Sequence, residues 1–204
     1  MWVDFRQLAQ LPLFYGIRQE ELPGMLECLG GFQKSYQKNE IIYLESDEVR
    51  NTGVILSGIV HMIKEDSEGC KTLLISMKDG ELFGESFSCG SRIDSQVSFL
   101  AATPCSILFL PFHRLLHSCQ KTCGFHYKLI ENMVQLLGDK NIKLMGKIEV
   151  ISKKTLRGKI MAYLRSQSEE RQSRHFAISM NRVELADYLC ADRSALTREL
   201  SAMK

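Results

Sequence analysis

Short apolar runs separated by glycine turns dominate the first half of the chain and predict an antiparallel β structure. The runs are rich in β-branched residues and are interrupted at Glu68-Gly69, Asp79-Gly80 and Gly90-Ser91. Short strands at regular spacing with glycine turns are typical of barrels and sandwiches. We therefore expect a β-roll, preceded by helices at Phe5–Ala9 and Glu20–Leu29. The predicted strands are Ile41–Leu44, Gly53–Ile63, Lys71–Met77, Val97–Ala101 and Ser106–Leu110.

An apolar stripe with heptad spacing predicts one long helix from about Gly124 to Ile151. Its members recur at alternating intervals of four and three residues, and one of them, Asn141, is polar. A narrow seam of this kind is typical of a parallel two-helix coiled coil, in which one buried Asn fixes the register at a cost in stability. The predicted dimer seam consists of Ile130, Val134, Leu137, Asn141, Leu144, Ile148 and Ile151.

The alternative for this helix is packing against its own domain alone, where apolar stripes are usually wider. The stripe is indeed widened by Met133, Leu136, Ile142 and Met145. We therefore expect the helix to contact both a partner chain and its own β domain.

A polar step at Ser152–Thr155 ends the seam and predicts a hinge between two domains. A further helix is expected over Leu156–Arg165, followed by a polar loop over Ser166–His175. The apolar residues Phe176–Ile178 then indicate a short strand. The predicted parts are a sensing domain of residues 1–123, a dimerisation helix of residues 124–151 and a C-terminal domain of residues 152–204.

Two short amphipathic helices joined by a tight turn close the chain. Asn181 is a good N-cap for the first helix, and Glu184, three residues later, completes a capping box. The turn lies at Leu189–Ala191, and Asp192 caps the second helix. Helices in this layout form a helix-turn-helix, whose second helix enters the major groove of DNA.

The outward face of the second helix carries residue types that read DNA. Arg pairs in bidentate fashion with guanine, and Ser or Thr reaches base edges or phosphates. We expect Arg198 to contact a guanine, while Arg193 serves either a base or a phosphate. The alternative is a small helical hairpin with a solvated arginine face. The predicted DNA-contacting residues are Arg182, Arg193, Ser194, Thr197 and Arg198.

Charge is divided unevenly along this chain of 204 residues and supports the DNA hypothesis. The net charge is only +2, but residues 152–204 hold 11 lysines and arginines against 6 acidic residues. The rest of the chain holds 15 and 18, so the C-terminal part is basic and the body is acidic. A basic segment of this kind favours a polyanionic partner, which here would be double-stranded DNA.

Several classes of protein are disfavoured by what the sequence lacks. Its longest apolar runs are too short to span a bilayer, and its first residues show no secretory signal. The seven cysteines include no CxxC pair, which disfavours a disulfide scaffold and is consistent with a cytoplasmic protein. Nucleophile elbows, Walker loops, HExxH and Rossmann fingerprints are also missing, so we do not expect an enzyme.

A group of histidines and cysteines between residues 113 and 126 raises the question of a metal or redox site. His113 and His117, like Cys119 and Cys123, are spaced i,i+4, which on a helix can chelate zinc. Without CxxC or HExxH spacing this pattern is weak, and we expect no metal. A redox role of these cysteines is equally unsupported. Haem is unsupported too, because nothing singles out one of the five histidines.

Taken together, the parts resemble the Crp/Fnr family of bacterial transcription factors, named after the cyclic-AMP receptor and the fumarate-nitrate regulator. The likeness rests on Leu11–Phe14, Leu56–Gly58 with Val60, Gly80–Glu85 and Asp192–Met203. It implies an α+β fold with an N-terminal β-roll of the cyclic-nucleotide-binding type (a double-stranded β-helix), a long dimerisation helix and a C-terminal winged helix-turn-helix. It also implies ligand-controlled binding of a homodimer to a near-palindromic promoter site, with contact to RNA polymerase.

The chain departs from the cyclic-AMP binders of this family at the phosphate site. In those proteins the Gly-Glu-x-x-Gly-Glu loop is followed by Arg-Ser or Arg-Thr, whereas an ungapped comparison places Ser95 and Gln96 there. Loss of this charge-assisted contact disfavours cyclic AMP. Leu144 and Met145 stand where the cyclic-AMP binders carry two hydroxyl residues. That pair favours an apolar or non-nucleotide effector, unless both residues belong to the dimer core.

Gly84 and Glu85 are candidate effector contacts with a structural alternative. Glycines at this loop permit tight turns, and Glu85 can instead accept hydrogen bonds from backbone amides. The predicted effector residues are Gly84, Glu85, Ser95, Gln96, Leu144 and Met145.

Further departures concern the iron–sulfur type and the DNA-reading unit. Iron–sulfur sensing needs a cysteine cluster near the N-terminus, whereas the first cysteine here is Cys28. Ser194 replaces an acidic residue of many members, and Cys190 replaces the glycine that is common at the turn. The chain stops at Lys204, where the family continues into a wing, so we expect a helix-turn-helix without its wing.

We therefore expect a ligand-responsive, homodimeric DNA-binding regulator of the bacterial cytoplasm whose effector is not cyclic AMP. The alternative is a cytosolic dimeric ligand or redox sensor whose C-terminal domain makes protein contacts instead of binding DNA. Salt dependence separates the two, because phosphate contacts predict DNA affinity that falls steeply with added salt.

Overall fold

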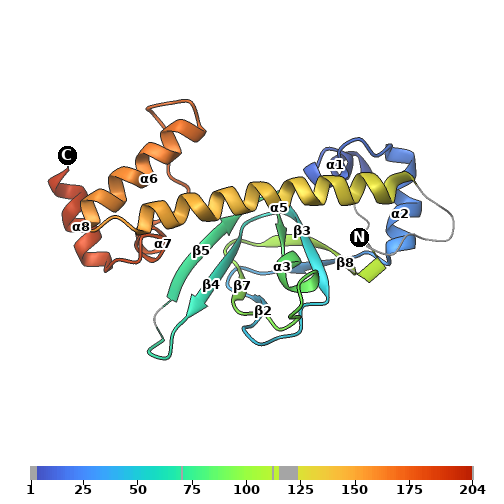
Figure 1. The fold of residues 1–204 in the computed structure, drawn as a ribbon, viewed down its shortest axis with the longest axis horizontal. Coiled ribbons are helices and arrows are strands. Elements are labelled where there is room, and N and C mark those ends of the chain that lie inside the picture. Colours follow the sequence, from blue (N-terminus) through green and yellow to red (C-terminus); the bar gives the residue numbers. More distant parts are fainter. Residues whose placement is uncertain (1–3, 70, 112, 115–123, 204) are drawn as a thin grey trace.

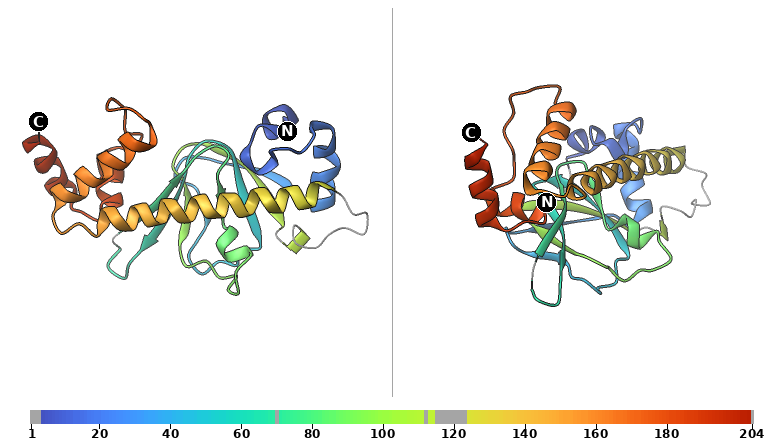
Figure 2. Two further views of the ribbon diagram at one scale, coloured as in Figure 1. Left: turned by 45° about the horizontal axis from the view of Figure 1, so that its top comes forward. Right: turned by 60° about the vertical axis from the view of Figure 1, so that its left-hand side comes forward.

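A single long helix, α5 (Gly124–Ile151), runs along the molecule, and the other elements are arranged beside it. The computed structural model describes residues 4–69, 71–111, 113–114 and 124–203. The β-roll lies against the middle of α5, the N-terminal helices lie at one end and the C-terminal helices lie at the other (Figure 1). Two further views show the same order (Figure 2). Within the ranges given above, no helix is long and apolar enough to cross a membrane.

The β-roll consists of two four-stranded antiparallel sheets, as the glycine-punctuated apolar runs predict. One sheet has the order β1-β8-β3-β6, and the other has the order β2-β7-β4-β5. Strand β8 is central in the first sheet and pairs with β1 from Phe109 opposite Phe32 to Cys105 opposite Tyr36. The strands are β1 (Phe32–Tyr36), β2 (Ile41–Tyr43), β3 (Asn51–Ser57), β4 (Val60–Glu65), β5 (Lys71–Met77), β6 (Leu82–Phe83), β7 (Ser98–Ala101) and β8 (Cys105–Pro111).

One predicted strand, Gly53–Ile63, is in fact two strands, because β3 ends at Ser57 and β4 begins at Val60. Gly58 forms the turn between them with φ +98°. A Cβ at this position would lie 2.5 Å from the carbonyl oxygen of Pro104. Because a left-handed backbone pressed against a carbonyl excludes other side chains, this glycine divides the apolar run.

Strands β1 and β6 were not predicted. The middle of β1 is Gln33-Lys34-Ser35, which has no apolar run, and pairing with β8 supplies its hydrogen bonds. Strand β6 has two residues and pairs with Gly53 and Val54 of β3. Long-range pairing forms both strands, and local sequence carries little sign of it.

The N-terminal segment contains α1 at Phe5–Ala9, as predicted, but the predicted helix Glu20–Leu29 is divided. A 3₁₀ turn, η2, covers Gln19–Glu21, and helix α2 covers Leu22–Leu29. Pro23 explains the division, because proline lacks the N–H that a helix interior needs and is tolerated only in the first turn.

Asn132 fastens the N-terminal segment to α5. Its side chain is 3% exposed, and its Nδ2 donates hydrogen bonds to the carbonyl oxygens of Leu13 and Tyr15, each at 2.8 Å. These carbonyls belong to the segment of the short helix η1 (Pro12–Phe14). A buried amide with two backbone partners fixes this segment against the long helix.

Three apolar clusters form the interior, and α5 contributes to each of them. The first joins the N-terminal helices to one sheet and includes Leu129 and Met133. The second fills the β-roll, with Leu144 packed against it. The third holds the C-terminal helices together and includes Val150. Packing against one helix therefore couples the three parts of the chain.

The C-terminal part contains α6 (Leu156–Glu170), α7 (Arg182–Tyr188) and α8 (Arg193–Ala202). Helix α6 extends five residues beyond the predicted end at Arg165, and an Arg165–Glu169 ion pair of 2.9 Å spans its last turn. Such i,i+4 pairs stabilise helices in sequences that otherwise look like loops.

The predicted strand at Phe176–Ile178 was wrong. The segment has no regular structure, and the carbonyl oxygen of Ala177 instead accepts a hydrogen bond of 2.7 Å from Arg171. No other strand among the described residues pairs with it. Apolar residues alone do not make a strand when no neighbouring strand is present.

Candidate nucleic-acid interface

The two closing helices are capped as their sequence predicts. Asn181 Oδ1 accepts hydrogen bonds from the backbone N–H groups of Val183 (2.8 Å) and Glu184 (3.1 Å). Glu184 returns the contact, because its Oε2 accepts from Asn181 N at 2.8 Å. Asp192 Oδ1 accepts from Ala195 N at 2.9 Å and begins α8. These reciprocal bonds satisfy the N–H groups that helix starts leave open.

The turn between α7 and α8 contains a left-handed residue, Cys190, and is stabilised by hydrogen bonds from Lys159. Cys190 has φ +49°, a left-handed conformation that is strained for any residue except glycine. Lys159 of α6 donates from Nζ to the carbonyl oxygens of Leu189 (3.0 Å) and Cys190 (3.4 Å). The ammonium of α6 thus supports the strained turn from outside, a role that the sequence alone did not reveal.

Helix α8 presents a polar face while Leu196 anchors it. Leu196 is fully buried, whereas Arg193, Ser194, Thr197 and Arg198 are exposed. The four predicted residues of this helix are therefore brought together on one surface. An anchored helix with an exposed polar face has the form that major-groove recognition requires.

The hydroxyl groups of this face are already used as donors. Ser194 Oγ donates to Asp192 Oδ1 at 2.6 Å, and Thr197 Oγ1 donates to the carbonyl oxygen of Arg193 at 2.9 Å. The bond from Ser194 lowers the pKa of Asp192. Because each hydroxyl carries a single proton, both groups offer acceptor lone pairs to the outside. The arginines are left as the donors of the face.

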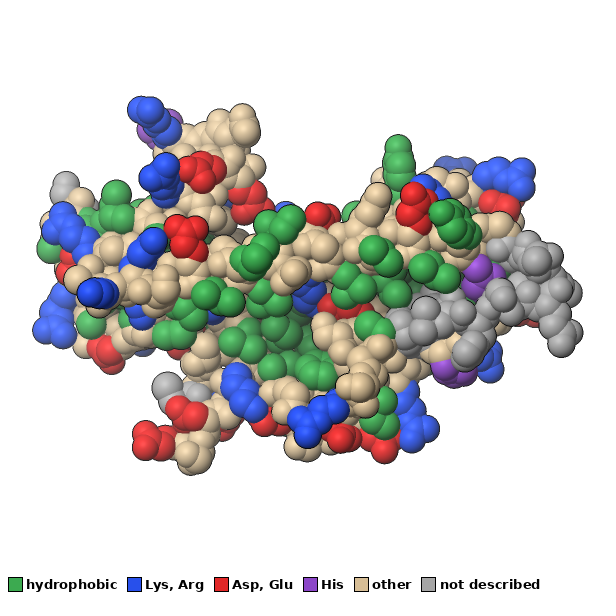
Figure 3. All heavy atoms as spheres, viewed as in Figure 1, with side chains coloured by type: hydrophobic (Ala, Val, Ile, Leu, Met, Phe, Trp, Pro, Cys, Tyr) green, Lys and Arg blue, Asp and Glu red, His purple; other side chains and the backbone are tan. Residues whose placement is uncertain are grey.

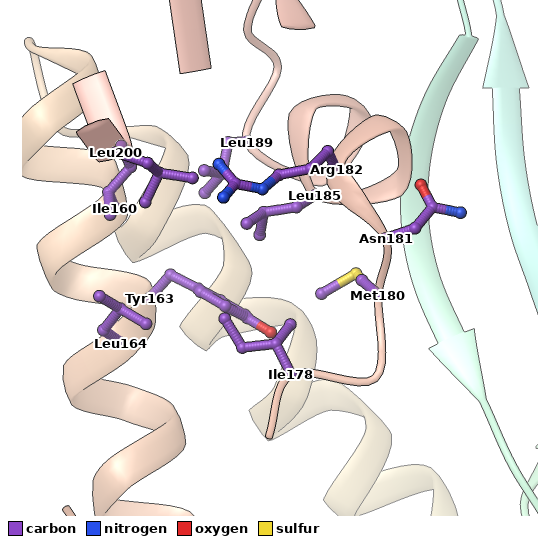
Figure 4. Close-up of a pocket in the computed structure, with 10 residues that line it drawn as sticks. All are labelled: Ile160, Tyr163, Leu164, Ile178, Met180, Asn181, Arg182, Leu185, Leu189 and Leu200. Atoms are coloured by element: carbon purple, nitrogen blue, oxygen red, sulfur yellow. The ribbon is translucent and has the colours of Figure 1, made fainter. Parts of the chain in front are cut away.

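Arg182, the fifth predicted residue, lies apart from α8. It comes from the first turn of α7, and its side chain extends along a cavity of about 430 Å³ (Figure 4). The wall of this cavity is mainly apolar and is formed by α6, the segment before α7, and α8. Its lining includes Ile160, Tyr163, Leu164, Ile178, Met180, Leu185 and Leu200.

The surface also contains a row of uncovered apolar side chains along α5, visible on one face of the molecule (Figure 3). Val134 and Ile148 of the predicted seam are each 61% exposed, and Asn141 is exposed between them. Leu137 and Leu144 are only partly exposed, because they also pack against the first and second apolar clusters. The predicted seam therefore lies mostly outside the protein's own core.

Glu85 opens the short helix α3 (Glu85–Ser88) and is buried next to α5. Its side chain is 1% exposed, and its Oε1 accepts a hydrogen bond of 2.6 Å from Lys140 Nζ. Lys140 also donates to the carbonyl oxygen of Leu82 at 3.0 Å. Glu85 Oε2 has no hydrogen-bond partner among the described residues. An ammonium from α5, rather than the expected backbone amides, therefore neutralises this carboxylate.

The glycine before Glu85 has a structural role. Gly84 has φ +76°, and a Cβ there would lie 2.9 Å from Cγ1 of Val49. Both the backbone conformation and the space favour glycine. The tight turn alone therefore explains why residue 84 is a glycine, without an effector contact.

The four remaining effector candidates differ in their burial and in their partners. Ser95 is fully buried, and its hydroxyl donates to the carbonyl oxygen of Val97 at 2.5 Å. Gln96 is exposed, and its amide donates to Asp94 O at 3.4 Å. Leu144 packs against the β-roll, whereas Met145 is 55% exposed.

Aromatic rings occupy the interior of the β-roll. The centroids of Phe83 and Phe99 lie 5.2 Å apart, and Phe83 and Phe109 form an edge-to-face pair at 6.1 Å. Tyr43 lies 6.1 Å from Phe109, and Phe87 lies 6.4 Å from Phe99. Such contacts between rings stabilise a packed interior beyond their simple burial.

Lys147 lies where α5, the β-roll and α7 meet. Its side chain is 5% exposed, and its Nζ donates to the carbonyl oxygen of Leu73 in β5. The same ammonium lies 4.0 Å from the centre of the Tyr188 ring in α7. Burial lowers the pKa of Lys147 to about 8, and the charges of Cys190 and Asp187 oppose this change.

Lys140 and Lys147 were not predicted, and their pattern explains why. Each stands one position before a seam residue, Asn141 or Ile148. Charged residues at such flanking positions are normally solvated or pair across a coiled coil. Lys140 and Lys147 are seven residues apart and therefore lie on the same side of α5, which faces the β-roll. This spacing was the sequence feature from which their burial could have been predicted.

The described residues contain no group of three metal-ligating side chains that could hold an ion. His113 is exposed, while His126 is buried on α5. His117, Cys119 and Cys123 lie outside the described residues. The structure therefore does not test a zinc or redox role of these three residues.

The β-roll coincides with a known domain family. Residues 33–122 match the sequence profile of the cyclic nucleotide-binding domain. The chain contains a cyclic nucleotide-binding domain. No curated protein matches the chain significantly in sequence.

Solved structures show the fold of most of the chain. The c-di-GMP responsive global regulator CLP of Xanthomonas campestris is 18% identical, with a TM-score of 0.73, over 89% of this chain and 91% of that chain. A CooA mutant of Carboxydothermus hydrogenoformans is 20% identical, with a TM-score of 0.68, over 88% and 78%. A transcriptional regulator of the CRP/FNR family from Thermus thermophilus is 19% identical, with a TM-score of 0.61, over 84% and 85%. The chain has the Crp/Fnr fold, as its sequence motifs predict.

Several described residues of this domain that could contact a nucleotide already have partners within the protein. Glu85 is already paired with Lys140, and the Ser95 hydroxyl is bonded within its own segment. Aromatic rings, Phe83 and Phe99 among them, occupy the interior between the sheets. A cyclic phosphate needs a charge-assisted partner. The two residues aligned with the Arg-Ser or Arg-Thr pair of the cyclic-AMP binders, Ser95 and Gln96, are both uncharged.

The Glu85–Lys140 pair gives a first prediction. Lys140→Met should destabilise the protein by about 3–5 kcal/mol, because it leaves a buried carboxylate without its counter-charge. Lys143→Met is the matched control, since Lys143 pairs with Glu81 but its side chain is 48% exposed; it should change stability by about 1 kcal/mol or less. Urea unfolding measures both, and equal effects of the two variants would contradict the prediction.

Lys147 gives a prediction for the dependence of stability on pH. The pKa of Lys147 is about 8 in the folded protein and has its ordinary value of 10.5 in the unfolded chain, so between these pH values the unfolded state binds more protons. The cost of burying the charge is therefore complete below pH 8 and is relieved as the pH rises toward 10.5. Unfolding of the wild type and of Lys147→Met, measured from pH 7 to pH 9.5, should show the wild type gaining stability relative to the variant. A constant difference would show that Lys147 has an ordinary pKa.

Proposed function

We propose that this chain is a DNA-binding transcriptional regulator that acts as a homodimer on a near-palindromic promoter site. The observation that carries the proposal is α8, which is capped by Asp192 and anchored by the buried Leu196. Its outward face consists of Arg193, Ser194, Thr197 and Arg198. The Crp/Fnr fold and the basic C-terminal part support the same function.

The chemistry of this face suggests how bases are read. We infer that Arg198 pairs with a guanine and that Arg193 contacts a base or a phosphate. Ser194 and Thr197 donate their protons within the helix, so they would accept hydrogen bonds from the amino groups of adenine or cytosine. The acidic residue that many family members carry in place of Ser194 has a similar acceptor character.

The uncovered seam of α5 supports the homodimer. Val134 and Ile148 are far more exposed than side chains of the apolar clusters, and exposed apolar rows of this kind mark interaction surfaces. A partner helix with the same heptad seam would cover them, with Asn141 fixing the register. Two copies of α8 would then contact half-sites about one turn of DNA apart.

The effector is proposed to differ from cyclic AMP. The aromatic interior of the β-roll and the Glu85–Lys140 pair support an effector that is not a cyclic nucleotide. We further propose a bacterial cytoplasmic protein without enzymatic activity, which contacts RNA polymerase as the family resemblance implies. The alternative function, a dimeric ligand or redox sensor whose C-terminal part binds protein, has no specific observation in its favour.

The central prediction concerns DNA binding by the full chain and its specificity. A binding site selected from random duplexes should be bound with an affinity that falls steeply as salt is added. Arg198→Ala should lose about 1–3 kcal/mol of binding to that site and should lose the preference for one base pair in each half-site. Fluorescence anisotropy with a panel of single-base variants measures both effects.

Two results would count against this prediction. Equal weakening of Arg198→Ala on every duplex would identify Arg198 as a phosphate contact. Absence of any affinity of the wild type for duplex DNA at low salt would refute the regulator hypothesis itself. The control is Arg174→Ala, which changes an exposed arginine outside α8 and should leave the base preference unchanged.

The dimer gives a separate prediction. Val134→Asp combined with Ile148→Asp should produce monomers, because charges would stand in the proposed seam. These positions are better targets than Leu137, whose side chain also supports the protein's own core. Gln135→Asp, which adds a charge to an exposed position off the seam, is the control. Light scattering measures the mass, and an unchanged dimer in the double variant would refute the proposed interface.

A further inference from the structure

Lys147 lies where three elements meet, and its ammonium contacts two of them in addition to the apolar packing between them. It belongs to α5, its ammonium donates to the Leu73 carbonyl in β5, and the same ammonium lies over the Tyr188 ring of α7. We propose that Lys147 is a positioning residue that fixes the recognition helix relative to α5 and thereby sets the half-site spacing that the dimer accepts. This inference rests on the proposed function.

The contacts of Lys147 are buried and directional. A side chain that is 5% exposed loses most of its hydration, so its ammonium needs partners in the protein. The Leu73 carbonyl provides a charge-assisted acceptor, and the face of Tyr188 provides a cation–π contact that strengthens when water is excluded. Rotation of α7 away from β5 would break the contact between the ammonium and the Tyr188 ring.

Helix α7 is packed against the β-roll beside Lys147. The helix contacts β5, and the two lie side by side at the C-terminal end of α5 (Figure 1). Polar and charged groups line the edge of this contact. Asp187 of α7 interacts electrostatically with Lys147 and with Lys71 of β5. His61 of β4 and Glu184 of α7 line the same small pocket, and burial lowers the pKa of His61. The contact therefore has several charged groups at its edge and the Lys147 ammonium at its centre.

The position of Tyr188 extends this link to α6. The rings of Tyr188 and Tyr163 lie 5.3 Å apart, and Tyr163 is buried in the cluster that holds the C-terminal helices. Lys147 is thus connected through one ring to the whole helix-turn-helix unit. The other connections between α5 and this unit are the short segment Ser152–Thr155 and the packing of Val150 in the same cluster.

The consequence for DNA follows from the geometry of a two-fold dimer. Two recognition helices reach successive major grooves only when their separation matches the DNA repeat of about 34 Å. If the seam fixes α5, the angle between α5 and the C-terminal unit determines this separation. A hinge alone would let the two units adapt to several spacings, whereas the Lys147 contact would hold them at one.

The test measures affinity as a function of half-site spacing. The full-length chain is offered its selected site and versions that are one base pair shorter and one or two longer. We expect the wild type to discriminate against the altered spacings and Lys147→Met to reduce that discrimination about tenfold, while affinity for the best spacing changes about threefold or less. Lys143→Met changes an exposed lysine one turn earlier on the same helix, and it should keep the wild-type discrimination.

Variants of Tyr188 keep the test decisive if Lys147→Met fails to fold. Tyr188→Phe retains the ring face and should behave as the wild type, whereas Tyr188→Leu removes it and should relax spacing as Lys147→Met does. The double variant Lys147→Met/Tyr188→Leu should be no more relaxed than either single variant, because one contact is removed twice. Additive effects of the two changes would contradict a shared contact.

Each result distinguishes this inference from the proposed function. Uniform loss of affinity at every spacing would identify Lys147 as a merely structural residue and overturn the inference. Unchanged discrimination in Lys147→Met and Tyr188→Leu would overturn it too, while leaving DNA binding intact. Lack of binding by the wild type at low salt would overturn the proposed function and this inference with it.

Discussion

The division of one helix surface between two tasks is the constraint on which this structure depends. Helix α5 contributes Leu129 and Met133 to the N-terminal cluster, Leu144 to the β-roll and Val150 to the C-terminal cluster. Because these contacts use only one side, the row that includes Val134 stays uncovered. A helix with fewer contacts would not hold three parts together, and one with wider contacts would leave no seam for a partner.

Two lysines extend the influence of α5 beyond apolar packing. Lys140 neutralises the buried carboxylate of Glu85, and Lys147 connects the Leu73 carbonyl to Tyr188 of the helix-turn-helix. Buried ammonium groups are costly unless they are fully partnered. Since each of these has partners from other segments, the cost of burial becomes a preference for one arrangement of the β-roll and α7 around α5.

The candidate DNA-reading surface could be predicted from sequence because its determinants are local. The caps at Asn181 and Asp192 depend on residues within one turn of each other, and the apolar spacing that marks Leu196 for burial is also local. The effector region could not be predicted in the same way. Its interior is filled by rings from different strands, such as Phe83 and Phe99, and no local pattern encodes that meeting.

The sequence by itself determined the order of the elements, the long helix Gly124–Ile151 and the two capped C-terminal helices, because periodicity and capping act over a few residues. Only the tertiary structure decided that Gly53–Ile63 forms two strands of different sheets, that β1 joins β8 and that Phe176–Ile178 is not a strand. It also decided which lysines of α5 are buried. Strand pairing and burial depend on partners that are distant in the chain, so no short segment of sequence is sufficient to predict them.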